Sequence, residues 1–153
     1  FYPGTGATDE RGNGNGEGFT VNVPLSSGGG DAIYRGAFER IVLPVLDEYK
    51  PDLILVSAGF DAALRDPLAE MTLTTNAFGW MALKLRELAD KHSGGRIGLV
   101  LEGGYDLPSL EAGLLAAISA LTLQGTSEIA RDVDADDLRR ATKAAQRVWT
   151  HLT

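Results

Sequence analysis

The sequence predicts an α/β protein with a parallel sheet, and two observations carry that prediction. Two short, continuous apolar segments, 52–59 and 96–104, are typical of strands covered on both faces of a parallel sheet. Apolar residues at helical spacing alternate with these strands, at 31–49, 76–92 and 110–123. Because strands and helices that alternate across short connections form parallel sheets, we expect one α/β domain.

The composition agrees with one modest domain and argues against several other classes. The 153 residues are 44% hydrophobic, which suffices for one core. A net charge of -7 argues against direct binding to nucleic acid, which needs a basic surface. The sequence has no cysteine, so it offers neither a disulfide framework nor a thiolate metal site. It shows no membrane span and no signal peptide, which favours a cytoplasmic protein, and we expect a bacterial source.

The N-terminal third is expected to be a loop followed by a long helix. Residues 1–30 are rich in glycine and are predicted to be mainly loop, with one alternating segment, 19–25, that is compatible with a strand. Residues 31–49 place apolar side chains at helical spacing. Pro44 lies inside this pattern and is expected to kink or divide the helix, because proline has no N–H to donate.

The glycine-rich segment does not match a phosphate-binding loop. After Gly4 and Gly6, the third glycine position of the G-x-G-x-x-G pattern is occupied by Asp9, and no Gly-Lys-Ser/Thr sequence is present. The later glycines also lack that register: Gly12, Gly14, Gly16 and Gly18. We therefore interpret the segment as a shaped surface loop.

The second half of the chain completes the alternation. Pro51 separates the predicted helix 31–49 from the first predicted strand. Asp106 or Ser109 is a candidate cap for the helix 110–123, which is apolar nearly all round and is expected to be buried. The segment 136–152 has the pattern of an amphipathic terminal helix.

Two polar residues follow the predicted strands at their carboxyl ends. Asp61 comes after the first strand and Tyr105 after the second. Ligands of open parallel sheets bind beyond the carboxyl ends of the strands, so both side chains are expected at one rim. Gly103 and Gly104 would let the backbone beside Tyr105 approach a ligand closely.

Each of these residues also has an ordinary structural interpretation when it is taken alone. An aspartate after a strand often caps a helix or closes a turn, and a tyrosine after two glycines is usually a packed aromatic. His92 and His151 are expected to be solvated helix residues rather than metal ligands. Only the combination of motifs along the chain decides between these interpretations.

Four motifs follow one another along the chain: FYPGTG (1–6), GFTVNVPL (18–25), SAGFDA (57–62) with DPL (66–68), and LEGGYDL (101–107). In this order and spacing they resemble the zinc-dependent histone deacetylase family, most closely its class II-like members and the bacterial deacetylase-like amidohydrolases. The resemblance extends to about residue 125 and implies the three-layer α/β/α arginase-deacetylase fold around a parallel sheet.

The resemblance implies a role for each matching residue. Asp61 would be one of three ligands of a catalytic Zn²⁺, and a carboxylate oxygen is an ordinary zinc ligand. Tyr105 would donate a hydrogen bond to the substrate carbonyl and stabilise the developing oxyanion. The channel for the acyl-lysine side chain would be lined by Phe1, Tyr2, Leu68, Gly103 and Gly104.

The implied reaction is hydrolysis of an acetyl or acyl amide by metal-activated water, with a histidine pair as general base and acid. The family has a His-His pair and an Asp-x-His motif that precede FYPGTG. This sequence has no His-His pair, and its only histidines, His92 and His151, follow FYPGTG and lie in the wrong context for either motif. We therefore interpret residues 1–153 as the C-terminal part of one catalytic domain, with a glycine-rich active-site loop and strand (1–30), an α/β core (31–125) and a terminal helix (126–153). With one ligand and no base, the chain alone is expected to be inactive.

The expected substrate is an acetylated protein lysine or a small N-acetyl amine. Polyamine-type relatives carry a glutamate after the Asp-Pro that follows the zinc aspartate, whereas this chain has Leu68 after Asp66 and Pro67. This difference favours acyl-lysine or a neutral amide over acetylpolyamines. The alternatives left open are an acetylpolyamine amidohydrolase, a non-catalytic deacetylase-like binding domain, and a ureohydrolase of the related fold, which the GGY motif fits poorly. The sequence does not predict the oligomeric state.

Overall fold

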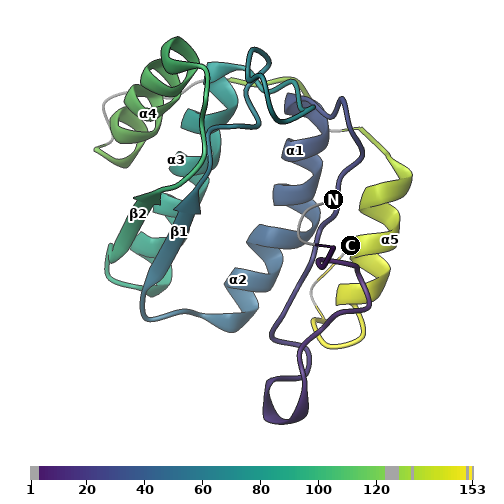
Figure 1. Ribbon diagram of the computed structural model, residues 1–153. Helices are drawn as coiled ribbons and strands as arrows, with labels where there is room; N and C mark the ends of the chain where they lie inside the picture. Colours follow the sequence, from purple (N-terminus) through teal and green to yellow (C-terminus); the bar gives the residue numbers. More distant parts are fainter. Residues whose placement is uncertain (1–3, 123–127, 132, 151, 153) are drawn as a thin grey trace.

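The computed structural model describes residues 4–122, 128–131, 133–150 and 152, and it confirms the predicted alternation of helices and strands (Figure 1). The short η1 turn precedes the main elements, and η2 is a π-helical segment inside the first long helix. The elements in chain order are η1 (Gly14–Gly16), α1 (Asp31–Ala37), η2 (Phe38–Val42), α2 (Leu43–Tyr49), β1 (Ile54–Ala58), α3 (Thr75–His92), β2 (Ile97–Leu101), α4 (Leu107–Leu121) and α5 (Asp136–Ala145).

The two strands form a parallel pair, as the sequence predicts. Ile54 lies opposite Ile97 at one end, and Ala58 lies opposite Leu101 at the other. Helix α3 is the crossover between the strands, so both strands end at the same rim, next to the start of α4 (Figure 1). In an open parallel sheet this rim is where ligands bind.

The described residues cover only one face of the sheet. Ile54 and Val56 pack with Leu88 of α3 in a buried cluster, whereas Leu55 and Val100, on the opposite face, are 70% and 58% exposed. The prediction that both faces are covered is therefore wrong for this part of the chain. The strands have apolar side chains on both faces, but the helices of the described residues pack against one of them.

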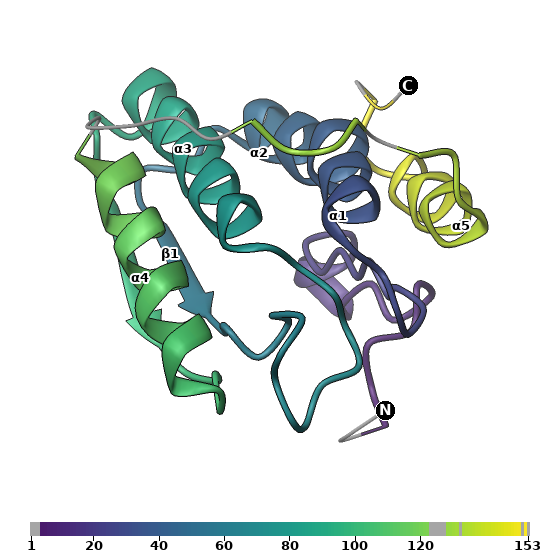
Figure 2. The same ribbon diagram turned by 90° about the horizontal axis from the view of Figure 1, so that it is seen from above.

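Helix α4 is also less buried than its apolar sequence predicts. Its buried face is made of small residues, Gly113, Ala117 and Ala120, which pack toward α3. Leu115 and Ile118 on the outer face are 57% and 47% exposed. Figure 2 shows α4 and α5 at opposite sides of the molecule, with α3 and α1 between them.

Pro44 disturbs the first long helix without breaking it. The helix runs from α1 through η2 to α2, and η2 ends directly before the turn that contains Pro44. Proline removes one backbone donor, and a π-helical widening is a common local response to a disturbed hydrogen-bond ladder.

Asp31, at the start of α1, accepts hydrogen bonds from the N–H and the hydroxyl of Thr74, the residue that precedes α3 (2.8 and 2.6 Å).

Two predicted elements at the ends of the chain differ from the structure. The segment 19–25 forms no strand, although Val21 and Val23 pack against the buried cluster around Ile41 and Trp149. Helix α5 ends at Ala145, rather than continuing to residue 152. Beyond it the chain turns so that the buried Trp149 ring donates a hydrogen bond to Gly18 O (3.1 Å), a tertiary contact that local periodicity does not reveal.

Among the described residues, no helix is both long and apolar enough to cross a membrane.

Candidate functional site

The turns that follow β1 and β2 are joined at the rim by backbone hydrogen bonds. Glu102 N donates to Ala58 O (3.1 Å), and Phe60 N donates to Gly103 O (2.8 Å). The pairing of the strands therefore continues past their ends into the two turns. Residues far apart in the sequence are thereby held together at this rim.

Phe60 anchors the turn that presents Asp61. Its ring is 3% exposed and lies 5.0 Å, between ring centroids, from the ring of Phe78 on α3. A Cβ atom at Gly113 of α4 would lie 2.8 Å from Phe60 Cδ1, so this glycine makes room for the ring. The residue directly before Asp61 is thus fixed between α3 and α4.

The Asp61 carboxylate lies close against two glycines. A Cβ atom at Gly103 would lie 2.6 Å from Asp61 Oδ2, and one at Gly59 would lie 2.8 Å from Asp61 Oδ1. Both distances are too short for a real side chain, so the carboxylate occupies space that only glycine leaves open. Within the part of the chain that the structure describes, this carboxylate has no hydrogen-bond or ion-pair partner. Its oxygens are available to a ligand.

Tyr34 of α1 is a neighbour of Asp61 that the sequence analysis missed. Burial raises the pKa of the Tyr34 phenol, and the negative charge of Asp61 raises that pKa further. The phenol therefore stays neutral at physiological pH. Its position beside Asp61 depends on the packing of α1 against the core around Phe60 and Phe78, which no local motif indicates.

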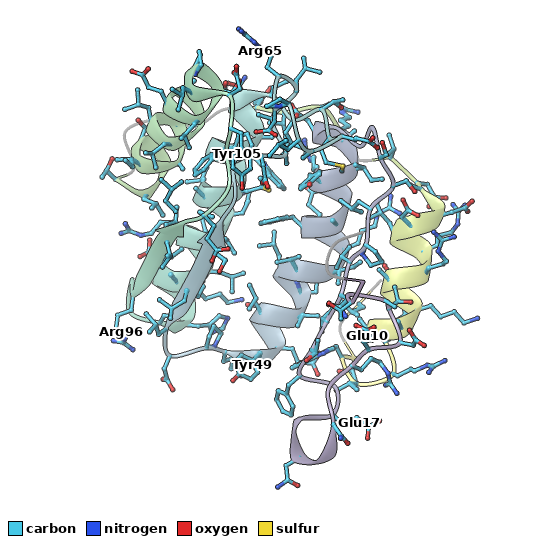
Figure 3. All side chains as sticks on the ribbon, viewed as in Figure 1. Glu10, Glu17, Tyr49, Arg65, Arg96 and Tyr105 are labelled. Carbon is cyan, nitrogen blue, oxygen red and sulfur yellow. The ribbon has the colours of Figure 1, made fainter. Side chains whose placement is uncertain are left out.

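Tyr105 stands at the end of β2 with its side chain 56% exposed (Figure 3). Gly104 before it has φ +136°, a backbone conformation that favours glycine. A Cβ atom at Gly104 would also lie 3.1 Å from Phe60 Cβ. The exposed phenol is therefore carried by a backbone turn that requires glycine. Asp61 and Tyr105 lie in the two turns that follow β1 and β2 at this rim.

One buried carboxylate, Asp66, connects this turn to the loop that follows Asp61. Asp66 Oδ2 accepts a hydrogen bond from Tyr105 N (2.7 Å), and Asp66 Oδ1 accepts one from Leu68 N (2.9 Å). Leu68 itself is 63% exposed at the rim. Asp66 belongs to the DPL motif, and the sequence alone predicts no role for its carboxylate.

The start of α4 is capped as predicted. Asp106 Oδ2 accepts a hydrogen bond from Ser109 N (3.1 Å), and Arg65 Nε lies 3.8 Å from the same carboxylate. The hydrogen bond from the Ser109 hydroxyl is the main cause that lowers the pKa of Asp106, and Arg65 lowers it further. Arg65 extends outward at the top of the view in Figure 3, and its side chain is 70% exposed.

The remaining candidate residues lie elsewhere or outside the described residues. Phe1, Tyr2 and His151 are outside the described residues. His92 lies at the end of α3, away from the rim, and the prediction that it is solvated is wrong: its side chain is 11% exposed, with Nε2 2.6 Å from Asp47 Oδ1. The described part of the chain contains no group of three His, Cys, Asp or Glu side chains that could hold a metal.

Comparisons with known proteins agree on one family, the one that the four motifs resemble. A family model described as "Histone deacetylase domain" matches residues 1–121. Histone deacetylase 10, chloroplastic, of Oryza sativa subsp. japonica is 50% identical over 111 residues, which are 72% of this chain and 25% of the relative. A histone deacetylase-like amidohydrolase of Pseudomonas aeruginosa is 42% identical over 132 residues, 86% of this chain and 34% of the relative.

A solved structure of the histone deacetylase Clr3 superposes with a TM-score of 0.89 at 32% identity, covering 100% of this chain and 26% of that one. The resemblance seen in the four motifs and the expected fold are thus confirmed. The chain spans between a quarter and about a third of the length of these three proteins.

Proposed function

The chain belongs to the histone deacetylase family, and we propose that the whole protein removes acetyl or acyl groups from lysine side chains or similar N-acetylated amines. The observation that carries this proposal is that Asp61 and Tyr105 lie in two turns that backbone hydrogen bonds join at one rim. A carboxylate without a partner among the described residues and an exposed phenol lie at the carboxyl ends of two parallel strands. The names of the relatives support the same reaction class.

We propose Zn²⁺ as the cofactor, with Asp61 as one ligand. The available carboxylate oxygens suit this ion, and Gly59 and Gly103 leave open the space that these oxygens occupy. The described residues do not supply a full ligand set, so we propose that the other ligands and the histidine base belong to parts of the whole protein outside this chain. When bound, the ion would polarise the substrate carbonyl and lower the pKa of a water molecule. On this proposal the chain alone is inactive.

In the proposed reaction Tyr105 donates its hydroxyl proton in a hydrogen bond to the carbonyl oxygen of the substrate. That oxygen gains negative charge as water adds to the amide, so the hydrogen bond strengthens in the transition state and stabilises it. Tyr34 stays neutral beside Asp61 and adds no competing charge. We further propose that Leu68, Gly103 and Gly104 line the channel for the alkyl chain, together with Phe1 and Tyr2.

Leu68 supports a preference for acyl-lysine or a neutral amide over acetylpolyamines. It is an exposed apolar side chain at the rim, where a carboxylate would be needed to attract a polycation.

No nucleic-acid contact is part of the proposal, in keeping with the net charge of -7. A cytoplasmic location and a bacterial source remain our predictions, and cell fractionation of the source organism would test the location.

The experiment that tests the proposal compares an acetyl-lysine peptide with acetylspermidine as substrates of the full-length protein. We expect turnover of the peptide to dominate, and Leu68→Glu to shift the ratio of kcat/KM values toward acetylspermidine. A wild-type preference for acetylspermidine would contradict the substrate assignment. Absence of amide hydrolysis in the zinc-loaded, folded protein would favour the alternative of a non-catalytic binding domain.

A further inference from the structure

Asp66 is a buried carboxylate that, among the described residues, accepts hydrogen bonds from the backbone of the two site loops. Its residue is 9% exposed. Oδ1 accepts from Leu68 N (2.9 Å) and Ala69 N (3.2 Å), and Oδ2 accepts from Tyr105 N (2.7 Å). Tyr105 is 39 positions away in the sequence, so this one side chain joins the loop after Asp61 to the loop after β2.

The charge of Asp66 is stabilised by these N–H groups. Burial opposes the ionised form, but hydrogen bonds from the backbone of Tyr105, Leu68, Ala69 and Asp106 outweigh burial and lower the pKa of Asp66. Hydrogen bonds to a charged acceptor are shorter and stronger than those between neutral groups. The link between the two loops is therefore stronger than an ordinary loop contact.

The side chains of the two residues that Asp66 holds are not fixed by packing. The side chains of Tyr105 and Leu68 are 56% and 63% exposed, so packing does not fix them. The glycine at 104 gives the backbone before Tyr105 extra freedom. Asp61 lies five residues before Asp66 on the same loop, so the bond to Tyr105 N sets how the phenol and the Asp61 carboxylate lie relative to each other.

We propose that Asp66 is a positioning residue of the deacetylase site: it fixes the backbone of Tyr105, and through it the phenol, relative to Asp61. This inference rests on the proposed function and adds to it a residue that touches neither metal nor substrate. Asp66 fixes Leu68 at the rim by the same means, so one carboxylate sets both the oxyanion donor and a wall of the proposed channel.

The test is Asp66→Asn in the full-length, zinc-loaded protein, with kcat for an acetyl-lysine peptide as the readout. The amide keeps the size of the side chain but replaces one acceptor oxygen by a donor, so either Tyr105 N–H or the Leu68 and Ala69 N–H groups lose their partner. Because small misplacements of a catalytic group are costly, we expect kcat to fall by about 10- to 100-fold.

A matched control is Asp137→Asn. Asp137 is 7% exposed and likewise accepts a backbone hydrogen bond, from Ser26 N (2.7 Å), but it lies on α5, away from the rim. This variant removes a buried, backbone-bonded carboxylate without touching the site. We expect its kcat per folded molecule to stay within about twofold of wild type, whatever its melting temperature, because distant sites act independently.

A double-mutant cycle with Tyr105→Phe separates positioning from loss of structure. If Asp66 acts through the Tyr105 hydroxyl, Asp66→Asn should lower kcat by less than about twofold once that hydroxyl is absent. A full, additive loss in the Tyr105→Phe background, or a wild-type kcat for Asp66→Asn, would overturn the inference.

A second variant covers the case in which Asp66→Asn does not fold. Asp66→Glu keeps the charge and both acceptor oxygens but displaces them by one methylene, and the same coupling to Tyr105→Phe is expected with a smaller loss. Hydrolysis by the wild-type protein is the reference for all variants. If the wild-type protein does not hydrolyse the peptide, the proposed function is contradicted. If it does, but the effects of the Asp66 and Tyr105 variants on kcat are not coupled, only the role of Asp66 is contradicted.

Discussion

The two ends of the β1–α3–β2 unit differ in the surroundings of one aspartate at each end, Asp47 and Asp61. At one end, the last turn of α3 contacts Asp47 of α2. Asp47 Oδ1 lies 2.5 Å from Lys91 Nζ and 2.6 Å from His92 Nε2. At the carboxyl end, Asp61 has neither a hydrogen-bond nor an ion-pair partner among the described residues, and its oxygens occupy space that a Cβ atom at Gly59 or Gly103 would fill. Both are single aspartates near the end of an element, yet only Asp61 is left available to a ligand.

This difference is the one that we expect between a carboxylate that stabilises the fold and a carboxylate that binds a ligand. The partners of Asp47 come from the chain itself and stabilise its charge, which lowers the pKa of Asp47 to about 2, with the hydrogen bond from Lys91 as the main cause. Asp61 instead lies beside the neutral phenol of Tyr34, in a turn that is hydrogen-bonded to the turn before Tyr105. The rim is therefore where an external cation and a polar substrate are expected.

The largest effect that we expect at the rim comes from Tyr105→Phe. The change removes only a hydroxyl from a side chain that is 56% exposed, so the free energy of unfolding should hardly change. Loss of an oxyanion donor should lower kcat in the full-length protein by about 100-fold or more. Steady-state kinetics with an acetyl-lysine peptide measures this, and a kcat near wild type would remove Tyr105 from the proposed mechanism.

A smaller effect is expected from Gly103→Ala. The new Cβ atom would lie 2.6 Å from Asp61 Oδ2, so the carboxylate has to move. Disturbing the support of a metal ligand typically weakens metal affinity by about 10- to 100-fold, which competition with a zinc chelator would measure in the full-length protein.

Gly16→Ala is the control for that substitution, because a Cβ atom at Gly16 would meet nothing within 4 Å. We expect its zinc affinity to equal that of wild type. Equal affinities for both variants would show that the glycines around Asp61 do not position a metal ligand.

The smallest effect is expected at the other end of the unit, from Asp47→Asn. The folded-state pKa of Asp47 is below its ordinary value, so its charge stabilises the fold above pH 3.8, and that contribution is lost as the pH falls toward about 2. Because the Asp47 side chain is 45% exposed, solvent screening should keep the loss at neutral pH below about 1 kcal/mol.

Urea unfolding at pH 7 and at pH 2.5 would measure this contribution. The difference in stability between wild type and Asp47→Asn should shrink at the lower pH, while deacetylation at neutral pH stays unchanged. A large loss of activity in Asp47→Asn would contradict the division between the two ends.

The elements and the rim could be predicted from local patterns. Continuous apolar runs gave both strands, and the positions of Asp61 and Tyr105 after them followed from parallel topology. Asp106 as a cap was also visible, because a cap interacts with a residue three positions away. Each of these features depends on neighbours in the sequence.

The features that could not be predicted depend on contacts between distant segments. The pairing of His92 with Asp47 spans 45 positions and the bond from Tyr105 to Asp66 spans 39, so neither leaves a local signal. The segment 19–25 alternates like a strand but finds no pairing partner among the described residues. Apolar side chains on both faces of the strands likewise gave the wrong expectation of burial for Leu55, which is 70% exposed.

The most direct test of the central claim is zinc titration of the metal-depleted, full-length protein, comparing wild type with Asp61→Ala. We predict that wild type regains hydrolysis of an acetyl-lysine peptide as one zinc ion binds per molecule, and that folded Asp61→Ala neither binds that ion tightly nor recovers activity. Equal zinc binding and equal activity in the two proteins would contradict the assignment of the unpaired carboxylate at the rim as a metal ligand.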